Sequence, residues 1–202
     1  MGEIYKGIPV DSEPEMFVLD WLFELQDRGF IHSIQRGREM QLGLGLVHGY
    51  RKVTVMKRKT KEEQIIQTIL DPHYYTPDFV VQWFPKALDI HIVSSVAQIS
   101  YERLDGLFVS HPNVKQDVGQ LYGTFIEVKP DHDYQDNTRR FIVNQKWMWD
   151  CRKVFINLVK PFKLYKSTFT PQAYLHTRKK KTEREIKWNI RTVDQYLESL
   201  NQ

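Results

Sequence analysis

The segment Phe125-Ile126-Glu127-Val128-Lys129 decides the fold, because it reads as a β-strand with charge on one side. In a strand, residues i and i+2 point to the same side. Glu127 and Lys129 therefore project together, while Ile126 and Val128 turn into a hydrophobic core. The apolar residues before this segment extend the predicted strand back to Leu121.

A second segment, Tyr75-Thr76-Pro77-Asp78-Phe79, places another carboxylate at the start of a strand. The proline favours extended geometry in the residue before it, and residues 79–84 continue as an apolar strand. Glu127 lies within an apolar strand, where an unpaired carboxylate is costly. Two carboxylates and a nearby ammonium can hold Mg²⁺ and position a water, which phosphodiester hydrolysis requires.

Size and composition fit one large domain, or one domain with an appendage. The chain has 202 residues, of which 41% are hydrophobic and 13% aromatic, enough for a substantial core. Cys151 is the single cysteine, which excludes a disulfide framework and a thiolate zinc site. Neither a signal peptide nor a membrane-length apolar run is evident. We expect a soluble, cytoplasmic protein with no membrane partner.

The formal net charge of +4 suits a polyanionic partner, and the cations are concentrated in runs. Residues 51–61 and 178–181 are strongly basic, whereas residues 1–27 are mainly acidic. Such runs are often only solvated faces, but a nuclease must neutralise a phosphate backbone. The residues predicted to contact nucleic acid are Lys57, Arg58, Lys59, Lys146, Arg178, Lys179 and Lys180.

Hydrophobic patterning predicts a chain that alternates helices and strands. Helices are expected at residues 12–28, 138–151 and from Thr192 onward; strands are expected at 31–35, 79–84, 88–96, 106–109, 121–128 and 154–159. The first helix has a capping box, Ser12 to Glu15, and Gly29 as its C-cap. The second is expected to turn Phe141, Ile142, Gln145, Trp149 and Met148 inward.

Four further segments complete the prediction. We expect residues 40–59 to form a β-hairpin or long bent strands, and residues 111–113 to form a turn. Residues 61–70 fit either a helix or a strand, and residues 162–170 suggest a strand or an extended arm.

With Pro77-Asp78 as the "PD" and Glu127-Val128-Lys129 as the "ExK", the chain resembles the PD-(D/E)XK nuclease superfamily. The order of elements over residues 12–159 is also similar to that family's core. The resemblance implies an α/β fold, a central mixed β-sheet flanked by helices on both faces, with a β-rich insertion at about 85–120. Residues 1–175 would form the nuclease domain, followed by a basic linker and C-terminal helix at 176–202.

The resemblance also implies roles for individual residues. Asp78, Glu127 and the carbonyl of Val128 would hold Mg²⁺, with Mn²⁺ as a substitute, and Lys129 would position the attacking hydroxide. Glu15 would complete the catalytic set, and Gln145 would contact DNA or the scissile phosphate. Alternatives remain at several positions: Glu13 for Glu15, Asp105 for Asp78, Lys146 for Gln145, and His73, Asp131 or His132 as additional ligands.

The expected function is a Mg²⁺-dependent DNA endonuclease of phage type, similar to Holliday-junction resolvases and acting on branched DNA in a bacterial or phage-infected cell. A symmetric junction is cut at two places, so a homodimer is expected. The alternatives are a transposon-end nuclease of the same superfamily, a catalytically inactive nucleic-acid-binding module, and an assembly protein that holds partners with its basic segments.

Overall fold

The computed structural model of the protein describes residues 3–95, 107–109, 111–116, 119–132 and 137–200. The chain divides into two compact units. We call Met1–Arg38 together with Pro77–Gln202 the core unit, and Glu39–Thr76 the insert unit. The core unit carries all the residues of the predicted catalytic set.

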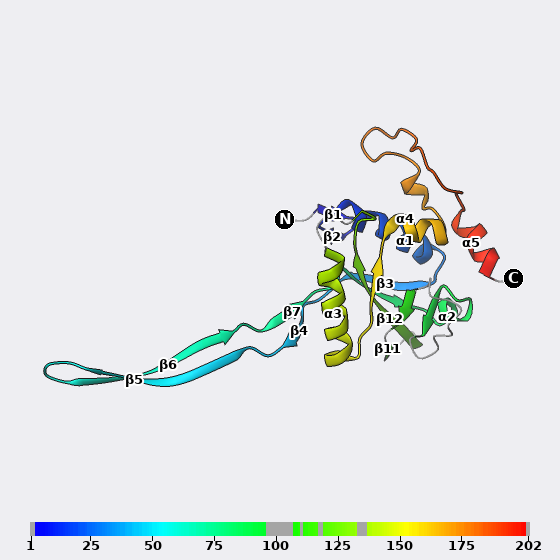
Figure 1. The fold of residues 1–202 in the computed structure, drawn as a ribbon. Helices are drawn as coiled ribbons and strands as arrows, with labels where there is room; N and C mark the ends of the chain where they lie inside the picture. Colours follow the sequence, from blue (N-terminus) through cyan, green and yellow to red (C-terminus); the bar gives the residue numbers. More distant parts are fainter. Residues whose placement is uncertain (1–2, 96–106, 110, 117–118, 133–136, 201–202) are drawn as a thin grey trace. The chain divides into compact units, whose positions relative to one another are not determined.

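A mixed five-stranded sheet forms the centre of the core unit (Figure 1). Its main path runs β11-β12-β8-β3, and β13 also pairs with β12. The pairing of β13 with β12 is parallel, and the other pairings are antiparallel. The strands are β3 (Ile31–Arg36), β8 (Phe79–Trp83), β11 (His111–Gln116), β12 (Gly119–Val128) and β13 (Ile156–Val159).

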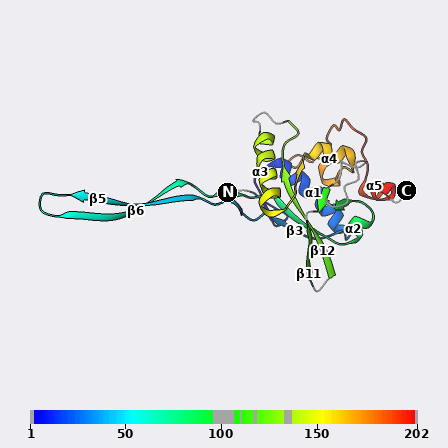
Figure 2. The ribbon, with the colours of Figure 1, turned by 60° about the horizontal axis from the view of Figure 1, so that its bottom comes forward.

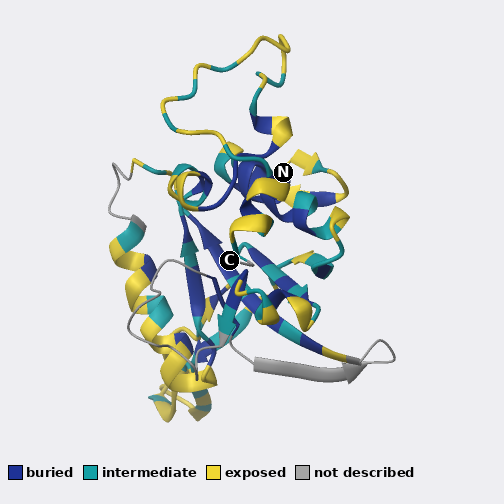
Figure 3. Ribbon diagram, turned by 90° about the vertical axis from the view of Figure 1, so that its right-hand side faces the viewer, coloured by how far each residue is buried: buried dark blue, intermediate teal, exposed yellow. Residues whose placement is uncertain are grey.

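One face of this sheet is covered by α1 (Glu13–Asp27) and α4 (Pro161–Ser167). Alternate residues of β8, beginning at Phe79, are fully buried in the same hydrophobic cluster as the apolar residues of α1. The hydroxyl of Tyr165 in α4 donates a hydrogen bond to the carbonyl oxygen of Phe17 in α1, at 2.7 Å. Figure 3 accordingly shows the central strands as buried.

The other face of the sheet is covered by α3 (Asn137–Arg152), as Figures 1 and 3 show. Phe141 and Met148 of α3 are buried, but outside the cluster that surrounds α1. Gln145 donates a hydrogen bond to the carbonyl oxygen of Ile156 in β13, at 2.6 Å. The expectation of a mixed α/β fold with a central sheet and helices on both faces is thus confirmed.

Smaller elements complete the core unit. The C-terminal helix α5 begins at the capping box that the sequence predicts: Thr192 and Gln195 exchange side-chain-to-backbone hydrogen bonds of 2.9 and 3.3 Å. The remaining elements are β1 (Glu3–Tyr5), β2 (Ile8–Val10), α2 (Lys86–Asp89), β9 (Val93–Ser95), β10 (Leu107–Val109), a 3-10 helix (Gln172–Tyr174) and α5 (Val193–Leu200).

The insert unit consists of two antiparallel strand pairs. The shorter pair joins β4 (Met40–Gly43) to β7 (His73–Tyr75). The longer pair joins β5 (Leu46–Val55) to β6 (Thr60–Leu70), and the two strands form one continuous ribbon in Figure 2.

Three strand or turn predictions are wrong. Residues 88–95, the described part of the strand expected at 88–96, do not form one strand: Pro85 and the helix-favouring residues after it start α2, and within 88–95 only β9 is a strand. Residues 162–170 contain most of α4, because Pro161 starts a helix and the backbone N–H groups of Phe162 and Lys163 are capped by Asp131. Residues 111–113 belong to β11, whose position at the sheet edge tolerates a proline.

Of the two alternatives for residues 40–59, the hairpin is wrong, because β4 pairs with β7 and β5 pairs with β6; the expectation of strands in this segment is confirmed. Residues 61–70 are therefore a strand, despite the charged residues at their start. On α3, Ile142 and Trp149 are each 41% exposed rather than inward-facing. Of the strand expected at 106–109, β10 covers 107–109, and residue 106 lies outside the described residues.

Within the described residues, no helix is both long and apolar enough to cross a lipid bilayer.

Gly37 lies where β3 approaches Asp78 closely. Its N–H donates a hydrogen bond to the Asp78 carbonyl oxygen at 3.0 Å. A Cβ at this position would overlap the carbonyl oxygen of Pro77 and lie 2.8 Å from the Pro77 carbonyl carbon. Only glycine permits this approach.

We expect Gly37→Ala to destabilise the protein by about 1–3 kcal/mol, as other overpacked sites do. Urea unfolding would measure the loss. Gly49→Ala is the matched control, because a Cβ added at Gly49 would meet no atom within 4 Å. Equal stability of the two variants would contradict the assigned backbone approach.

Candidate active site at the end of the β8–β12 pair

Asp78 and Glu127 are brought together by the register of β8 and β12. Ile126 pairs with Phe79, so the next position along each strand places Glu127 opposite Asp78. The N–H of Val128 donates a hydrogen bond to Asp78 Oδ2 at 2.7 Å. The side chains of Asp78 and Glu127 are only 15% and 10% exposed. Both carboxylates are therefore held at one end of the strand pair, in a largely buried setting.

Lys129 lies beside Glu127, as the alternation of the strand predicts. Its Nζ is 2.5 Å from Glu127 Oε1, and its side chain is 21% exposed. Ile126 and Val128 are buried, so the prediction for this segment is confirmed. The Lys129 N–H also donates to the Val159 carbonyl oxygen at 3.0 Å, which continues the hydrogen-bonded ladder to β13.

Glu15 is buried at the start of α1, where it accepts several hydrogen bonds. Oε1 accepts from the Ser12 hydroxyl at 2.9 Å, and Oε2 accepts from the Asp11 N–H at 3.0 Å. The Ser12 side chain accepts no hydrogen bond from the N–H groups of the helix, and Glu15 bonds the N–H of Asp11 rather than that of Ser12, so the two reciprocal bonds of the expected capping box do not form. Glu13, the alternative, is 61% exposed and lies 3.8 Å from Arg184. The inward-pointing carboxylate is that of Glu15.

Arg36, a residue that the sequence patterns did not indicate, joins these carboxylates. Its guanidinium nitrogens lie 2.5 Å from Asp11 and 2.5 Å from Glu15. Nη2 is 3.8 Å from Asp78 Oδ1. Arg36 ends β3 opposite Phe79, so it reaches the site through a strand register that no local pattern encodes. The sequence offered one local signal for Arg36: it is a charged residue at the end of a predicted strand, directly before Gly37.

The environment of Asp78 raises the pKa of its carboxyl group to about 7. Burial is the largest cause, and the neighbouring charge of Glu127 is the second. Glu15 acts in the same direction, whereas the hydrogen bond from Val128 and the charge of Lys129 oppose the shift. At Asp78, burial and the neighbouring carboxylates thus outweigh the Val128 hydrogen bond and the Lys129 charge.

The donor set fits a hard divalent cation. Among the described residues, no group of three or more His, Cys, Asp and Glu side chains is arranged to hold a metal ion. The predicted ligands are instead two carboxylates, Asp78 and Glu127, and the Val128 carbonyl, all oxygen donors of the kind Mg²⁺ prefers. A cation at this position would offset the burial and the Glu127 charge that raise the pKa of Asp78.

Two of the predicted residues lie on α3. Gln145 is partly buried, and its amide is engaged with the Ile156 carbonyl, so it fastens α3 to β13. Lys146 is exposed and lines a surface cavity of about 470 Å³ together with Gln145, Trp149, Asp150 and Phe155. That Gln145 also contacts DNA stays a prediction.

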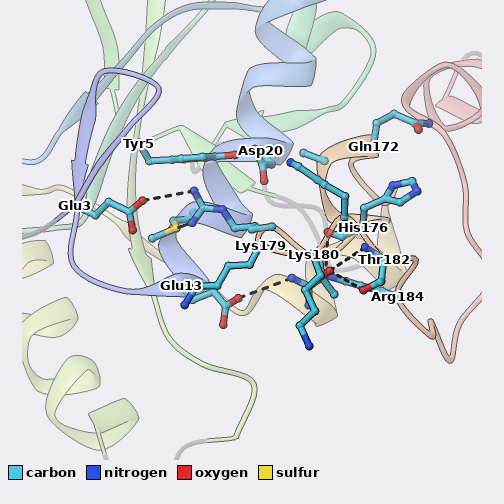
Figure 4. A pocket seen from close by; sticks show the side chains of 15 residues that line it. Glu3, Tyr5, Glu13, Asp20, Gln172, His176, Lys179, Lys180, Thr182 and Arg184 are labelled. Carbon is cyan, nitrogen blue, oxygen red and sulfur yellow. Dashed lines mark hydrogen bonds and ion pairs between the residues drawn. The ribbon is translucent and has the colours of Figure 1, made fainter.

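The basic residues of the 176–184 segment line a cavity of about 990 Å³ beside α1 (Figure 4). Arg178 lies over the ring of Tyr5, at 4.4 Å from the centroid, and 3.8 Å from Glu3. Arg178 thus fastens the segment to β1 within the core unit. Lys179 and Lys180 are exposed and have no ion-pair partner among the residues that the structure describes.

The other candidates are placed as follows. Lys57, Arg58 and Lys59 are exposed in the turn between β5 and β6. Asp131 caps the N-terminus of α4 through both carboxylate oxygens. Among the alternative ligands, His73 lies in β7 of the insert unit, His132 is exposed, and Asp105 lies outside the described residues.

No protein-family model, curated protein or solved structure matches the chain.

The raised pKa of Asp78 predicts a pH-dependent instability in the metal-free protein. Between about pH 4 and pH 7 the folded state binds more protons than the unfolded state, so stability falls as pH rises through this range. Asp78→Asn removes the charge and keeps an acceptor for the Val128 N–H. We expect it to be more stable than the parent at pH 8, by at most about 4 kcal/mol.

Thermal unfolding of the parent and of Asp78→Asn in EDTA, at pH 5 and pH 8, would test this. The difference in stability between the two proteins at each pH removes the contribution of groups that titrate alike in both. The gain should shrink or vanish at pH 5. A gain of the same size at both pH values would contradict the raised pKa.

A second prediction concerns the ion pair of Arg36 with the buried Glu15. Arg36→Met leaves a buried carboxylate without its cation, and we expect a loss of about 2–4 kcal/mol. Glu15→Gln combined with Arg36→Met should cost less than the sum of the single changes, because neither charge is then left alone. Urea unfolding of the four proteins would measure the coupling.

Arg28→Met is the matched control for this cycle. Arg28 pairs with Asp194 in an exposed setting, with side chains 40% and 61% exposed, so its loss should be much smaller. Additive effects in the Glu15–Arg36 cycle would show that the pair does not act as a unit.

Proposed function

We propose that the chain is a Mg²⁺-dependent nuclease that hydrolyses phosphodiester bonds in DNA. One observation carries the proposal: the buried carboxylate of Asp78 lies against Glu127, with Lys129 and Arg36 beside them. Crowded carboxylates next to a lysine are what metal-assisted phosphodiester hydrolysis needs. A buried charge cluster of this kind is costly if it serves stability alone.

Asp78, Glu127 and the Val128 carbonyl would hold the divalent ion, which supplies Lewis-acid stabilisation of the phosphate and a more acidic water when bound. The chain orients these donors through its own backbone. The Val128 N–H holds Asp78 Oδ2, which fixes the rotamer of the carboxylate and aligns it with β12. Burial of both side chains excludes most competing water from the donors.

Lys129 is the residue assigned to the attacking water. Its ammonium lies 2.5 Å from Glu127 in the metal-free state, so it is already held at the site. A lysine here can donate a hydrogen bond to the incoming water and offset negative charge as it develops on the phosphate. Hydrolysis in this arrangement would leave 5′-phosphate and 3′-hydroxyl ends.

Glu15 and Arg36 act around Asp78. Arg36 links the start of α1 to the end of β3 through Asp11 and Glu15 and lies 3.8 Å from Asp78. This link holds α1 in place against the strand pair. Because Glu15 raises the pKa of Asp78 through its charge, neutralisation of Glu15 by Arg36 limits how far that pKa rises.

Branched DNA is the proposed substrate, with a homodimer that makes the paired cuts. The net charge of +4 and the basic runs support a polyanionic partner. The order of helix, strands, helix and buried strand agrees with the superfamily that the motifs resemble. These points favour DNA cleavage over assembly by protein contacts, whose binding would depend little on salt.

One observation favours a second candidate, a DNA-binding module that does not cleave. Glu127 is engaged by Lys129 and Glu15 by Arg36, so part of the acidic charge is already balanced within the chain. A protein that had lost its metal could be held together by the same pairs. Cleavage in Mg²⁺ separates the two candidates.

The test is cleavage of supercoiled plasmid in Mg²⁺ and in EDTA. We expect cleavage only with Mg²⁺ or Mn²⁺. Asp78→Ala and Lys129→Ala should each lower the rate by about 10²-fold or more, as the loss of a metal ligand or of a group that acts in the transition state does. Lys163→Ala, a change in an exposed lysine of α4, should leave the rate unchanged.

A panel of four-way junction, flap, nicked and linear DNA would then define the substrate, with faster cutting of the junction expected. Binding without cleavage in any divalent ion would support the inactive module. Undiminished cleavage by both Asp78→Ala and Lys129→Ala would show that the assigned residues do not form the active site.

A further inference from the structure

The β5–β6 ribbon of the insert unit has no covering layer among the described residues. It runs over ten residue pairs, from Leu46–Leu70 to Val55–Thr60, and closes with a hydrogen bond of 2.9 Å from Met56 N–H to the Lys59 carbonyl (Figure 2). Nearly all of its residues are exposed. An isolated two-stranded hairpin is marginally stable in water, so a ribbon of this length is suited to bind something.

The end of the ribbon carries uncompensated positive charge. Two cations near it are paired within the ribbon, Arg51 with Glu62 and Lys61 with Glu63. The other cations form no ion pair with any residue that the structure describes; they are Lys52, Lys57, Arg58 and Lys59. The last three lie in the turn itself, and this turn with its two flanking residues, Met56–Thr60, is called the tip.

One side of the ribbon carries exposed β-branched residues, interrupted by the Arg51–Glu62 ion pair on the same side. In an antiparallel pair, residues opposite each other project from the same face, so the register places alternate residues of β5 together with Ile66 of β6. These residues are β-branched and highly exposed: Val47 56%, Val53 52%, Val55 80% and Ile66 75%. Met56, at the tip, is 46% exposed. Apolar area and cations are thus presented together at the tip.

We propose that the β5–β6 ribbon is an arm that enters the major groove of duplex DNA. Lys57, Arg58 and Lys59 contact the phosphates on the two sides of the groove, and Val55 and Met56 contact the floor. The proposal deepens the proposed function and rests on it for the choice of DNA. Paired strands lie about 4.8 Å apart, and the major groove, about 12 Å wide, admits a two-stranded ribbon.

Charge favours DNA over a second copy of the chain as the occupant. If two ribbons paired edge to edge or face to face at their tips, the unpaired cations of one would meet those of the other, and like charges placed opposite each other destabilise a sheet. An acidic groove instead neutralises the cations and releases counterions. It also covers the exposed valine and methionine side chains with the apolar parts of bases and sugars.

The experiment measures DNA binding without cleavage. Fluorescence anisotropy in EDTA, with a labelled 20-base-pair duplex and the corresponding single strand, gives the affinity of the full-length chain across a range of salt concentrations. The test variant is Lys57→Ala/Arg58→Ala/Lys59→Ala. The matched control is Lys57→Arg/Arg58→Lys/Lys59→Arg, which keeps every charge at the tip. Circular dichroism and sedimentation of each protein report the fold and the oligomeric state.

We expect the alanine variant to bind duplex at least tenfold more weakly. The slope of log affinity against log salt is negative, and its magnitude should decrease by about 2–3, close to 0.9 for each lost phosphate contact. The charge-preserving variant should keep the parental slope. Val55→Thr/Met56→Ser should weaken duplex binding severalfold without changing the slope, because it removes apolar contact only. The parent should prefer duplex over the single strand.

Three results would overturn the proposal: parental affinity and slope in the alanine variant, equal losses for duplex and single strand, or dissociation of a dimer by Val55→Thr/Met56→Ser with DNA binding intact. The readout is independent of catalysis. If the parent never cleaves DNA but the alanine variant loses binding, the DNA-binding arm is supported and the proposed nuclease activity is contradicted. If the alanine variant binds DNA as the parent does and plasmid is cleaved, the nuclease activity is supported and the DNA-binding arm is contradicted.

Discussion

The hydrogen bond from the Val128 N–H to Asp78 Oδ2 is the contact on which the candidate site depends, because it joins positions 50 residues apart in the chain. It does so at the end of a register that is fixed by buried residues, with Phe79 and Ile126 both fully buried. A slip of one residue would turn these apolar side chains outward and separate the carboxylates. The hydrophobic core therefore fixes the chemistry of the site as well as its stability.

Charge at this site is balanced by cations from different parts of the chain. Lys129 comes from the same strand as Glu127, while Arg36 comes from β3 and reaches both Glu15 and Asp78. The balance is incomplete, since burial and neighbouring carboxylates still raise the pKa of Asp78 to about 7. A fold selected for stability alone would more readily place apolar residues here. The incomplete balance is the physical argument for a bound cation.

Sequence patterns predicted the parts of the fold whose signals are local. The alternation of Ile126, Glu127, Val128 and Lys129 predicted the correct sides of β12. Patterns failed where a partner distant in the sequence decides the outcome. Pro161 and Asp131 together make α4 a helix, and the pairing of β5 with β6 overrides the helix-forming charges at the start of β6. Arg36 was missed for the same reason, because its importance arises from the β3–β8 register.

The two basic runs of the chain show why composition alone cannot assign contact with DNA. Arg178 lies in one run, but it is used within the core unit, against Tyr5 and Glu3. The other run, residues 51–61, lies along the β5–β6 ribbon. Its three cations at the tip form no ion pair with an acidic residue among those described, whereas Arg51 and Lys61 pair with Glu62 and Glu63. None of the ribbon's residues belongs to the main hydrophobic cluster. Cations placed there can change without loss of core packing, whereas changes at Arg178 would disturb the fold. Surface charge that the fold does not need is therefore the better guide to where a polyanion binds.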